Sequence, residues 1–448
     1  MNITIDKKQN CEAELHIELD AQTVQERRKG IVQRYQKLAR VPGFRPGKTP
    51  LAVVEKRFSK EIDGELREAL VGDGCREAAS EHKLAVIKVR DVRNDTFQPD
   101  GNFSFTADLT LEPEIVLPEY KGIKVTAPAA EVSDALFHTR LTELRRQFAA
   151  YADITDRPLK DGDIAIIDFS GTVLGTPIEE AEPEAPLAIR GTTGYWVRVE
   201  EGGFLPGFVP QIQGMSIGDS KENVVVTLPE DHPLTSLAGA ELVYKVEIKG
   251  IKESTLPEVD DAFAERLLPG KTAAELLDLF RQRILDEVIQ KRREKIVEQI
   301  VTHLDNSTSA ELPADIVNSE TQRRVDQMVE NGLRQGLDND DIEAKQEEIF
   351  ASAAEQARHS VKTTFLLEQI ARAENLSVSD QELIVRIDGL ARRSNKTLKK
   401  LVGELKRENL IENLRAQMLV GKAIDFLVLH AEVTEGEIAD APASLAEA

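Results

Sequence analysis

The sequence predicts a multidomain α+β protein with three parts: an N-terminal α+β domain, a β-rich middle domain and an all-α C-terminal region. Strand-like alternation flanks helical patterns in residues 1–112, and alternation with frequent glycine and proline is typical of residues 157–252. Long helical periodicity fills residues 253–433. At 448 residues, the chain has room for about three domains of roughly 150 residues each.

The N-terminal domain is predicted from a change of period along the chain. Alternation of apolar and polar residues indicates half-buried strands, and spacing of three to four residues indicates helices. The predicted elements are strands at 3–5 and 13–19, helices at 21–38 and 50–82, and strands at 84–92 and 103–111. A connector with a helix near 133–151 is expected over residues 113–156, where Pro118 and Pro128 interrupt regular structure.

The middle and C-terminal parts are recognised by different signals. Predicted strands of the middle domain lie at 163–171, 224–229 and 241–248. In the C-terminal region, Thr272 to Glu275 and Ser379 to Glu382 form capping boxes at the starts of helices. Helical patterns continue over 315–375 and 397–430, and residues 434–448 are expected to be a disordered tail because they are rich in Ala and Glu and show no period.

Composition excludes several classes of protein. The chain has no run of about 18 apolar residues that would span a membrane and no apolar signal-peptide core in its first ten residues, so we expect a cytoplasmic protein. Its two cysteines, Cys11 and Cys75, are expected to be reduced, and its seven histidines show no metal-ligand spacing. No metal or cofactor is expected.

Charge is unevenly distributed over a chain of net charge −22. Residues 1–112 hold 19 basic and 19 acidic residues, so the whole excess of acid lies in the remainder. From Arg27 to Lys60 there are eleven basic residues and only one acidic residue, Glu55. This pattern is typical of a docking module attached to an acidic body.

A turn rich in glycine and proline lies inside the basic stretch. Residues 43–50 read Gly-Phe-Arg-Pro-Gly-Lys-Thr-Pro, which favours an exposed turn with Phe44 and Arg45 at its tip. An apolar and a cationic group side by side suit an acidic surface such as ribosomal RNA with its proteins. Gly47-Lys48-Thr49 resembles the end of a phosphate-binding loop, but Gly43 is one residue too near and a helix, not a strand, precedes it.

These parts together resemble the trigger factor family of ribosome-associated chaperones over essentially the full length. The family's docking motif, Gly-Phe-Arg-x-Gly-x-x-Pro, is matched by Gly43, Phe44, Arg45, Gly47 and Pro50, with Lys48 inside it. Residues 167–171, 204–208 and 213–219 resemble an FKBP-type prolyl isomerase. The resemblance implies a ribosome-docking domain, an FKBP-like domain and a helical chaperone domain, in that order.

The resemblance also implies an apolar pocket for proline. It would be lined by Phe169, Ile178, Phe204, Leu205, Phe208 and Tyr244. This sequence departs from the common pattern at Ile178, Glu179 and His232, where an aromatic residue, an aspartate and a tyrosine are usual. The implied partners are the large ribosomal subunit near the exit tunnel and unfolded nascent polypeptides, with no membrane partner and with self-association away from the ribosome.

Two other hypotheses remain open from the sequence. A free cytosolic prolyl isomerase with helical arms would act on short peptides and would not bind ribosomes. An RNA-binding or assembly factor would bind naked RNA with a steep salt dependence, although the basic stretch lacks the interleaved aromatic residues that stack on bases.

Overall fold

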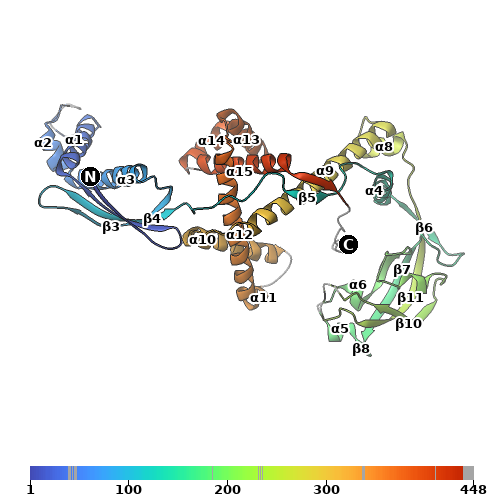
Figure 1. Ribbon diagram of the computed structural model, residues 1–448. Helices are drawn as coiled ribbons and strands as arrows, with labels where there is room; N and C mark the ends of the chain where they lie inside the picture. Colours follow the sequence, from blue (N-terminus) through green and yellow to red (C-terminus); the bar gives the residue numbers. More distant parts are fainter. Residues whose placement is uncertain are drawn as a thin grey trace. The chain divides into compact units, whose positions relative to one another are not determined.

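The computed structural model describes residues 1–38, 42, 44, 48–183, 185–230, 232, 234, 236–334, 339–408 and 410–436. The chain divides into two compact units, residues 1–129 with 291–448 and residues 130–290. Along the chain, an α+β part, a β-rich part and a helical part follow one another (Figure 1), which confirms the predicted fold class. None of the described helices is long and apolar enough to cross a membrane.

An antiparallel sheet covered by three helices forms the N-terminal part of the first unit (Figure 1). Because strand side chains alternate between faces, Leu15, Ile17 and Phe105 all point to one side. There they are buried with Ile62 and Leu66 of the third helix. The sheet order is β1-β2-β4-β3. The elements are β1 (Asn2–Lys7), β2 (Glu12–Leu19), α1 (Ala21–Leu38), α2 (Leu51–Arg57), α3 (Ser59–Glu81), β3 (Val86–Phe97) and β4 (Phe103–Leu111).

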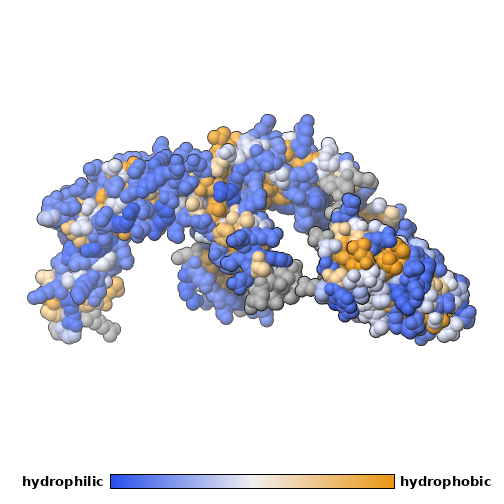
Figure 2. All heavy atoms as spheres, turned by 90° about the horizontal axis from the view of Figure 1, so that it is seen from below, coloured by the Kyte–Doolittle hydropathy of each residue, from blue (hydrophilic) through white to orange (hydrophobic). Residues whose placement is uncertain are grey.

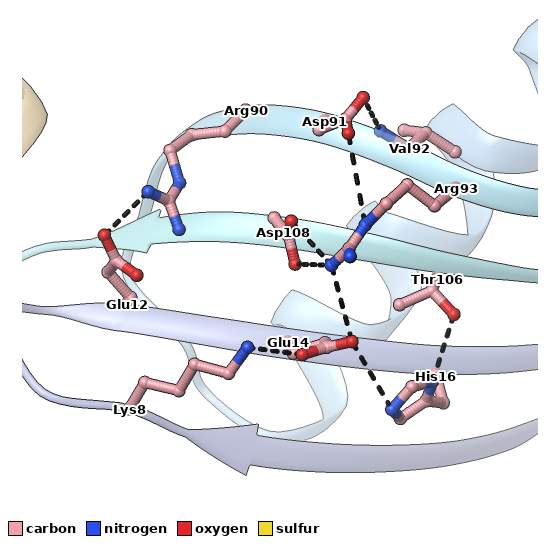
Figure 3. Close-up of polar contacts among 10 residues, drawn as sticks. All are labelled: Lys8, Glu12, Glu14, His16, Arg90, Asp91, Val92, Arg93, Thr106 and Asp108. Carbon is pink, nitrogen blue, oxygen red and sulfur yellow. Dashed lines mark hydrogen bonds and ion pairs between the residues drawn. The ribbon is translucent and has the colours of Figure 1, made fainter.

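The other face of this sheet is polar, and ion pairs connect its strands (Figure 3). Arg93 of β3 lies 2.8 Å from Asp108 of β4 and 3.5 Å from Glu14 of β2. Glu14 also accepts a hydrogen bond from Lys8, and this bond lowers the pKa of the Glu14 carboxyl. Since these groups are reached by solvent, we expect them to align the strands more than to stabilise the fold.

The second unit contains a six-stranded sheet in which all pairs are antiparallel. Its longest strand, β11, pairs with β6, β7 and β10, and β7 pairs further with β8 and β9. The elements are α4 (Asp134–Arg146), β6 (Ala150–Ile154), β7 (Ile164–Val173), β8 (Thr176–Pro177), α5 (Ile178–Ala181), α6 (Leu187–Arg190), β9 (Gly191–Arg198), α7 (Val209–Ile212), β10 (Ser220–Thr227), β11 (Glu241–Thr255) and α8 (Asp261–Leu267).

Helices make up most of the remainder of the first unit. Ile300 of α9, Ile370 of α12 and Leu427 of α15 belong to one apolar core, and α13, α14 and α15 share a second. Helix α9 begins within the second unit and ends within the first. The elements are β5 (Lys124–Ala127), α9 (Ala273–Asn306), α10 (Ala314–Arg334), α11 (Asn339–Ala344), α12 (Gln346–Ala373), α13 (Asp380–Arg393), α14 (Leu398–Arg407), α15 (Ile411–His430) and β12 (Glu432–Glu435).

The observed elements differ from the predicted ones in several places. The helix expected over 50–82 is two helices that meet at Phe58. The connector contributes β5, which pairs in parallel with β12, and β6, which joins the middle sheet. The tail expected from Thr434 therefore starts inside a strand, and residues 437–448 lie outside the described part of the chain. Strands of four residues alternate too few times to be distinguished from loops.

Candidate functional site

Five aromatic rings gather on the inner face of the middle sheet. Phe169 is at their centre, with its ring centroid 5.5 Å from that of Phe204, 5.7 Å from that of Tyr195 and 5.8 Å from that of Tyr244. Phe208 lies 4.8 Å from Phe204 and 5.8 Å from Tyr244, measured in the same way. Most of these contacts are edge-to-face or tilted, the arrangements that aromatic rings prefer.

The strand register explains which rings reach this cluster. Tyr195 of β9 is opposite Ile167 of β7, so the two side chains share a face with Phe169, two residues further along β7. Trp196 is opposite Ile166 and therefore points to the other face, where it is 50% exposed and contacts Tyr151. Tyr195 is not among the six residues that the resemblance implied for the pocket, although the parity of a strand residue decides its face.

The structure brings all six residues of the implied proline pocket into one apolar cluster. Phe169, Ile178, Phe208 and Tyr244 are buried, and Phe204 and Leu205 pack against them while remaining partly exposed. The cluster therefore has a buried floor and a rim that solvent reaches at Phe204, Leu205 and Tyr195. The roles of these residues stay predictions.

A buried hydroxyl fixes one side of the cluster. Tyr244 donates a hydrogen bond of 2.9 Å to the backbone carbonyl of Ile189, at the end of α6. Burial raises the pKa of the Tyr244 hydroxyl far above its ordinary value, so this group remains a neutral donor. Gly171 makes the close approach possible, because a Cβ there would lie 2.6 Å from both Ile178 Cδ1 and Tyr244 Cε1.

Two of the three departures from the common pattern do not belong to the apolar cluster. Glu179 in α5 is exposed and forms no ion pair with a described residue. His232 Nδ1 accepts a hydrogen bond of 3.2 Å from the backbone of Leu234. Ile178, the third departure, is fully buried, and its Cδ1 lies against Gly171.

Apolar residues also gather on the surface of the middle part. Figure 2 shows this patch on the side where Figure 1 places α5 and α6. Two exposed leucines belong to this end of the sheet: Leu174 follows β7 and is fully exposed, and Leu187 in α6 is 55% exposed.

The second candidate region is the basic turn between α1 and α2. Phe44 is 43% exposed, one of two phenylalanines, with Phe350, that the described part of the chain leaves more than a third exposed. Lys48 is exposed, and Pro50 directly precedes α2. Gln36 of α1 donates a hydrogen bond of 2.6 Å to the carbonyl of the buried Thr49, which fixes the end of the turn. The predicted residues Gly43, Arg45 and Gly47 lie outside the described part of the chain.

Acidic residues of α2 and α3 neutralise part of the basic stretch, and of these the local sequence indicated only Glu55. Arg28 pairs with Glu55 and Asp63, both at 2.7 Å, and these hydrogen bonds raise the pKa of the guanidinium. Arg27 pairs with Asp73 at 2.9 Å, and Arg34 pairs with Glu65. Six other cations have no ion pair with any residue that the structure describes: Lys29, Lys37, Lys48, Lys56, Arg57 and Lys60.

Comparisons with known proteins match most of the chain. The family model described as "Bacterial trigger factor protein (TF)" matches residues 1–144, and the model described as "Bacterial trigger factor protein (TF) C-terminus" matches residues 272–429. The trigger factor of Akkermansia muciniphila is 35% identical over 437 residues, which cover 98% of this chain and 100% of the relative. The trigger factor of Koribacter versatilis is 32% identical over 92% of each chain, and that of Caldicellulosiruptor bescii is 29% identical over 97% of each.

Proposed function

Because this chain belongs to the trigger factor family, we propose that it is a ribosome-associated chaperone of the cytoplasm. It binds nascent polypeptides near the exit tunnel of the large subunit and accelerates the cis/trans isomerisation of X-Pro bonds without ATP. The observation that carries this proposal is the exposed Phe44 in a turn whose neighbouring helices bear unpaired cations.

Docking combines two kinds of contact. The six unpaired cations supply long-range attraction to ribosomal RNA, which accelerates encounter and makes binding sensitive to salt. Phe44, with Arg45 beside it in the sequence, then inserts an apolar group into the protein surface that the RNA surrounds. Arg27, Arg28 and Arg34 contribute less, because acidic partners within the domain already engage them.

The isomerase activity rests on the aromatic cluster. Rotation about a peptide bond has a barrier of about 18–20 kcal/mol, because its partial double bond must be twisted. A proline ring seated on the rim at Tyr195, Phe204 and Leu205 would remove water from the preceding amide. An apolar surface that binds the twisted amide better than either planar form accelerates rotation and requires no nucleophile or metal.

Client binding is assigned to the helical part, which leaves large apolar side chains on its surface. Phe350 of α12, Val385 of α13 and Leu429 of α15 are more than half exposed. Scattered apolar contacts of this kind hold an unfolded chain weakly and release it as the client buries its own apolar residues. A client held in this way meets the isomerase at a raised effective concentration.

Co-sedimentation with purified ribosomes at moderate salt tests the proposal. We expect Phe44→Ala combined with Arg45→Ala to lower ribosome binding at least tenfold, while isomerisation of a short proline peptide is unchanged. The matched control is Trp196→Ala with Lys252→Ala, which removes an exposed ring and a cation 5.5 Å from it in the middle part. Equal binding by the wild type and the turn variant would reject docking through the turn, and a free isomerase would then be favoured.

A further inference from the structure

A second basic surface lies in the helical part of the chain. Residues 386–407, which span most of α13 and all of α14, contain eight basic and two acidic residues, a net charge of +6 in a chain of −22. This segment is separate from the basic stretch of the N-terminal domain, and neither docking nor isomerisation uses it.

Helix α14 carries its cations on one face. Leu398, Leu401, Val402 and Leu405 pack into the apolar core that α13, α14 and α15 share. With 3.6 residues per turn, the opposite face holds Lys399, Lys400, Gly403, Lys406 and Arg407. All five of these residues are exposed.

The four cations surround a glycine at helical neighbour positions. Lys399 and Lys400 are four and three residues before Gly403, and Lys406 and Arg407 are three and four residues after it. Residues at these spacings are neighbours on a helix surface. A Cβ at Gly403 would meet nothing within 4 Å, so the centre of the ring is open.

The cations are available to a partner. None of the four forms an ion pair with any residue in the described part of the chain. The single acidic residue of α14, Glu404, pairs with Lys396 at 2.7 Å, and this hydrogen bond lowers the pKa of the Glu404 carboxyl. The charge of Glu404 is therefore compensated mainly by a residue outside the ring, and Lys400 and Arg407 of the ring lower its pKa further.

We propose that the cation ring around Gly403 on α14 binds the phosphate backbone of RNA. The exposed face offers four cations and an open centre, which suit closely spaced phosphates, and no apolar side chain that would anchor an acidic peptide. Residues 380–410 contain no aromatic residue, so bases are not stacked and the contact is independent of base sequence. This inference goes beyond the proposed docking through Phe44 and isomerisation, and depends on neither.

Fluorescence anisotropy of the full chain with a labelled 20-nucleotide oligouridine, between 25 and 150 mM KCl, tests the proposal. The variant replaces Lys399, Lys400, Lys406 and Arg407 by Gln. Each phosphate contact on single-stranded nucleic acid contributes about −0.7 to the slope of log K against log salt, so the variant should lose a slope of about 3 and at least tenfold in affinity at low salt. Circular dichroism checks that α14 still folds.

A control of equal charge separates the ring from the net charge of the chain. It replaces four exposed cations of α9 and α12 by Gln: Arg283, Lys291, Lys295 and Arg358. We expect its slope to change by less than about 1, because Arg283 and Lys295 already pair with Glu287 and Glu298, and Arg358 lies on a different helix from the other three. Equal losses in the control and the ring variant would overturn the proposal.

Two further arms test the geometry and the class of partner. Gly403→Gln keeps the charge but fills the open centre, and should weaken RNA binding about threefold at an unchanged salt slope. Unchanged affinity in this variant would overturn the assignment of the ring. A labelled 20-residue polyglutamate should bind more weakly than the RNA, and equal affinity for it would identify an acidic-peptide site instead. In the Phe44→Ala, Arg45→Ala variant, replacement of the four α14 cations should still lower the salt slope of RNA binding by about 3.

Discussion

The basic turn and the aromatic cluster are two candidate binding regions built in opposite ways. Phe44 is 43% exposed and forms no ring contact with a described residue, whereas Phe208 is fully buried against Phe169, Phe204 and Tyr244. A side chain that supports no neighbours can be changed at little cost to folding. Binding and stability should therefore be separable in the turn and coupled in the cluster.

The largest expected effect is that of Phe208→Ala. Removal of a fully buried phenylalanine leaves a cavity and should destabilise the middle part by about 3–5 kcal/mol. The same change should lower prolyl isomerisation at least tenfold, because Phe204 would lose a ring contact of 4.8 Å. Urea denaturation followed by Trp196 fluorescence measures the first effect, and a proline-peptide assay measures the second.

Phe350→Ala is the matched control for Phe208→Ala. Phe350 lies on α12 and is 55% exposed, so its removal should change stability by less than about 0.5 kcal/mol. If Phe208→Ala unfolds at the same urea concentration as the control, the aromatic cluster does not stabilise the middle part. Binding and stability would then be separable in the cluster as well as in the turn.

A smaller effect is expected from Tyr244→Phe, which keeps the ring and removes only the hydrogen bond to the Ile189 carbonyl. The net loss should be about 1 kcal/mol, as for a typical buried hydrogen bond. Because this bond fixes the end of α6 beside the cluster, kcat should fall while KM changes little. A change in KM alone would show that the hydroxyl contacts the substrate and does not position α6. Tyr151→Phe is the control, since it removes an exposed hydroxyl from the other face of the same sheet.

The sequence predicts features that depend on near neighbours. The two capping boxes are present, with Ser379 and Glu382 exchanging hydrogen bonds and Thr272 accepting from Glu275 at 3.4 Å. The helical period and the capping residues depend only on positions close together in the sequence. The helices that begin at these caps can therefore be predicted without knowledge of the fold. The grouping of the six residues of the implied pocket could be predicted only through the family resemblance. The resemblance carries information about distant contacts that period and composition do not contain.

Features that depend on distant partners could not be predicted. The pairing of β5 with β12 joins residues about 300 positions apart, and neither strand is long enough to give a period. The neutralisation of Arg27 and Arg34 by Asp73 and Glu65 requires α1 to lie on α3. Local charge counting therefore overestimated the free positive charge around the turn.

The smallest expected effect compares an ion pair of the middle part with one beside the basic turn. Asp163, buried at the start of the middle sheet, accepts hydrogen bonds from the Arg157 guanidinium and from the backbone N–H of Lys160. Burial alone would raise its pKa, but these donors outweigh burial and lower it below the ordinary value of 3.8. Its stabilising contribution is therefore complete above that value and is lost as the pH falls through the lower folded pKa.

Asp163→Asn should accordingly lower the free energy of unfolding of the middle part at pH 7. It should also make that free energy less dependent on pH below 4. Asp63→Asn also removes a carboxylate from an arginine, but Arg28 keeps Glu55 at 2.7 Å in a partly exposed site, so stability should change by less than about 0.5 kcal/mol. Thermal unfolding of both variants at pH 7 and at steps from pH 5 to 2.5 measures the difference. Equal destabilisation by the two changes would show that the exposed region near the turn is as tightly coupled to folding as the middle sheet.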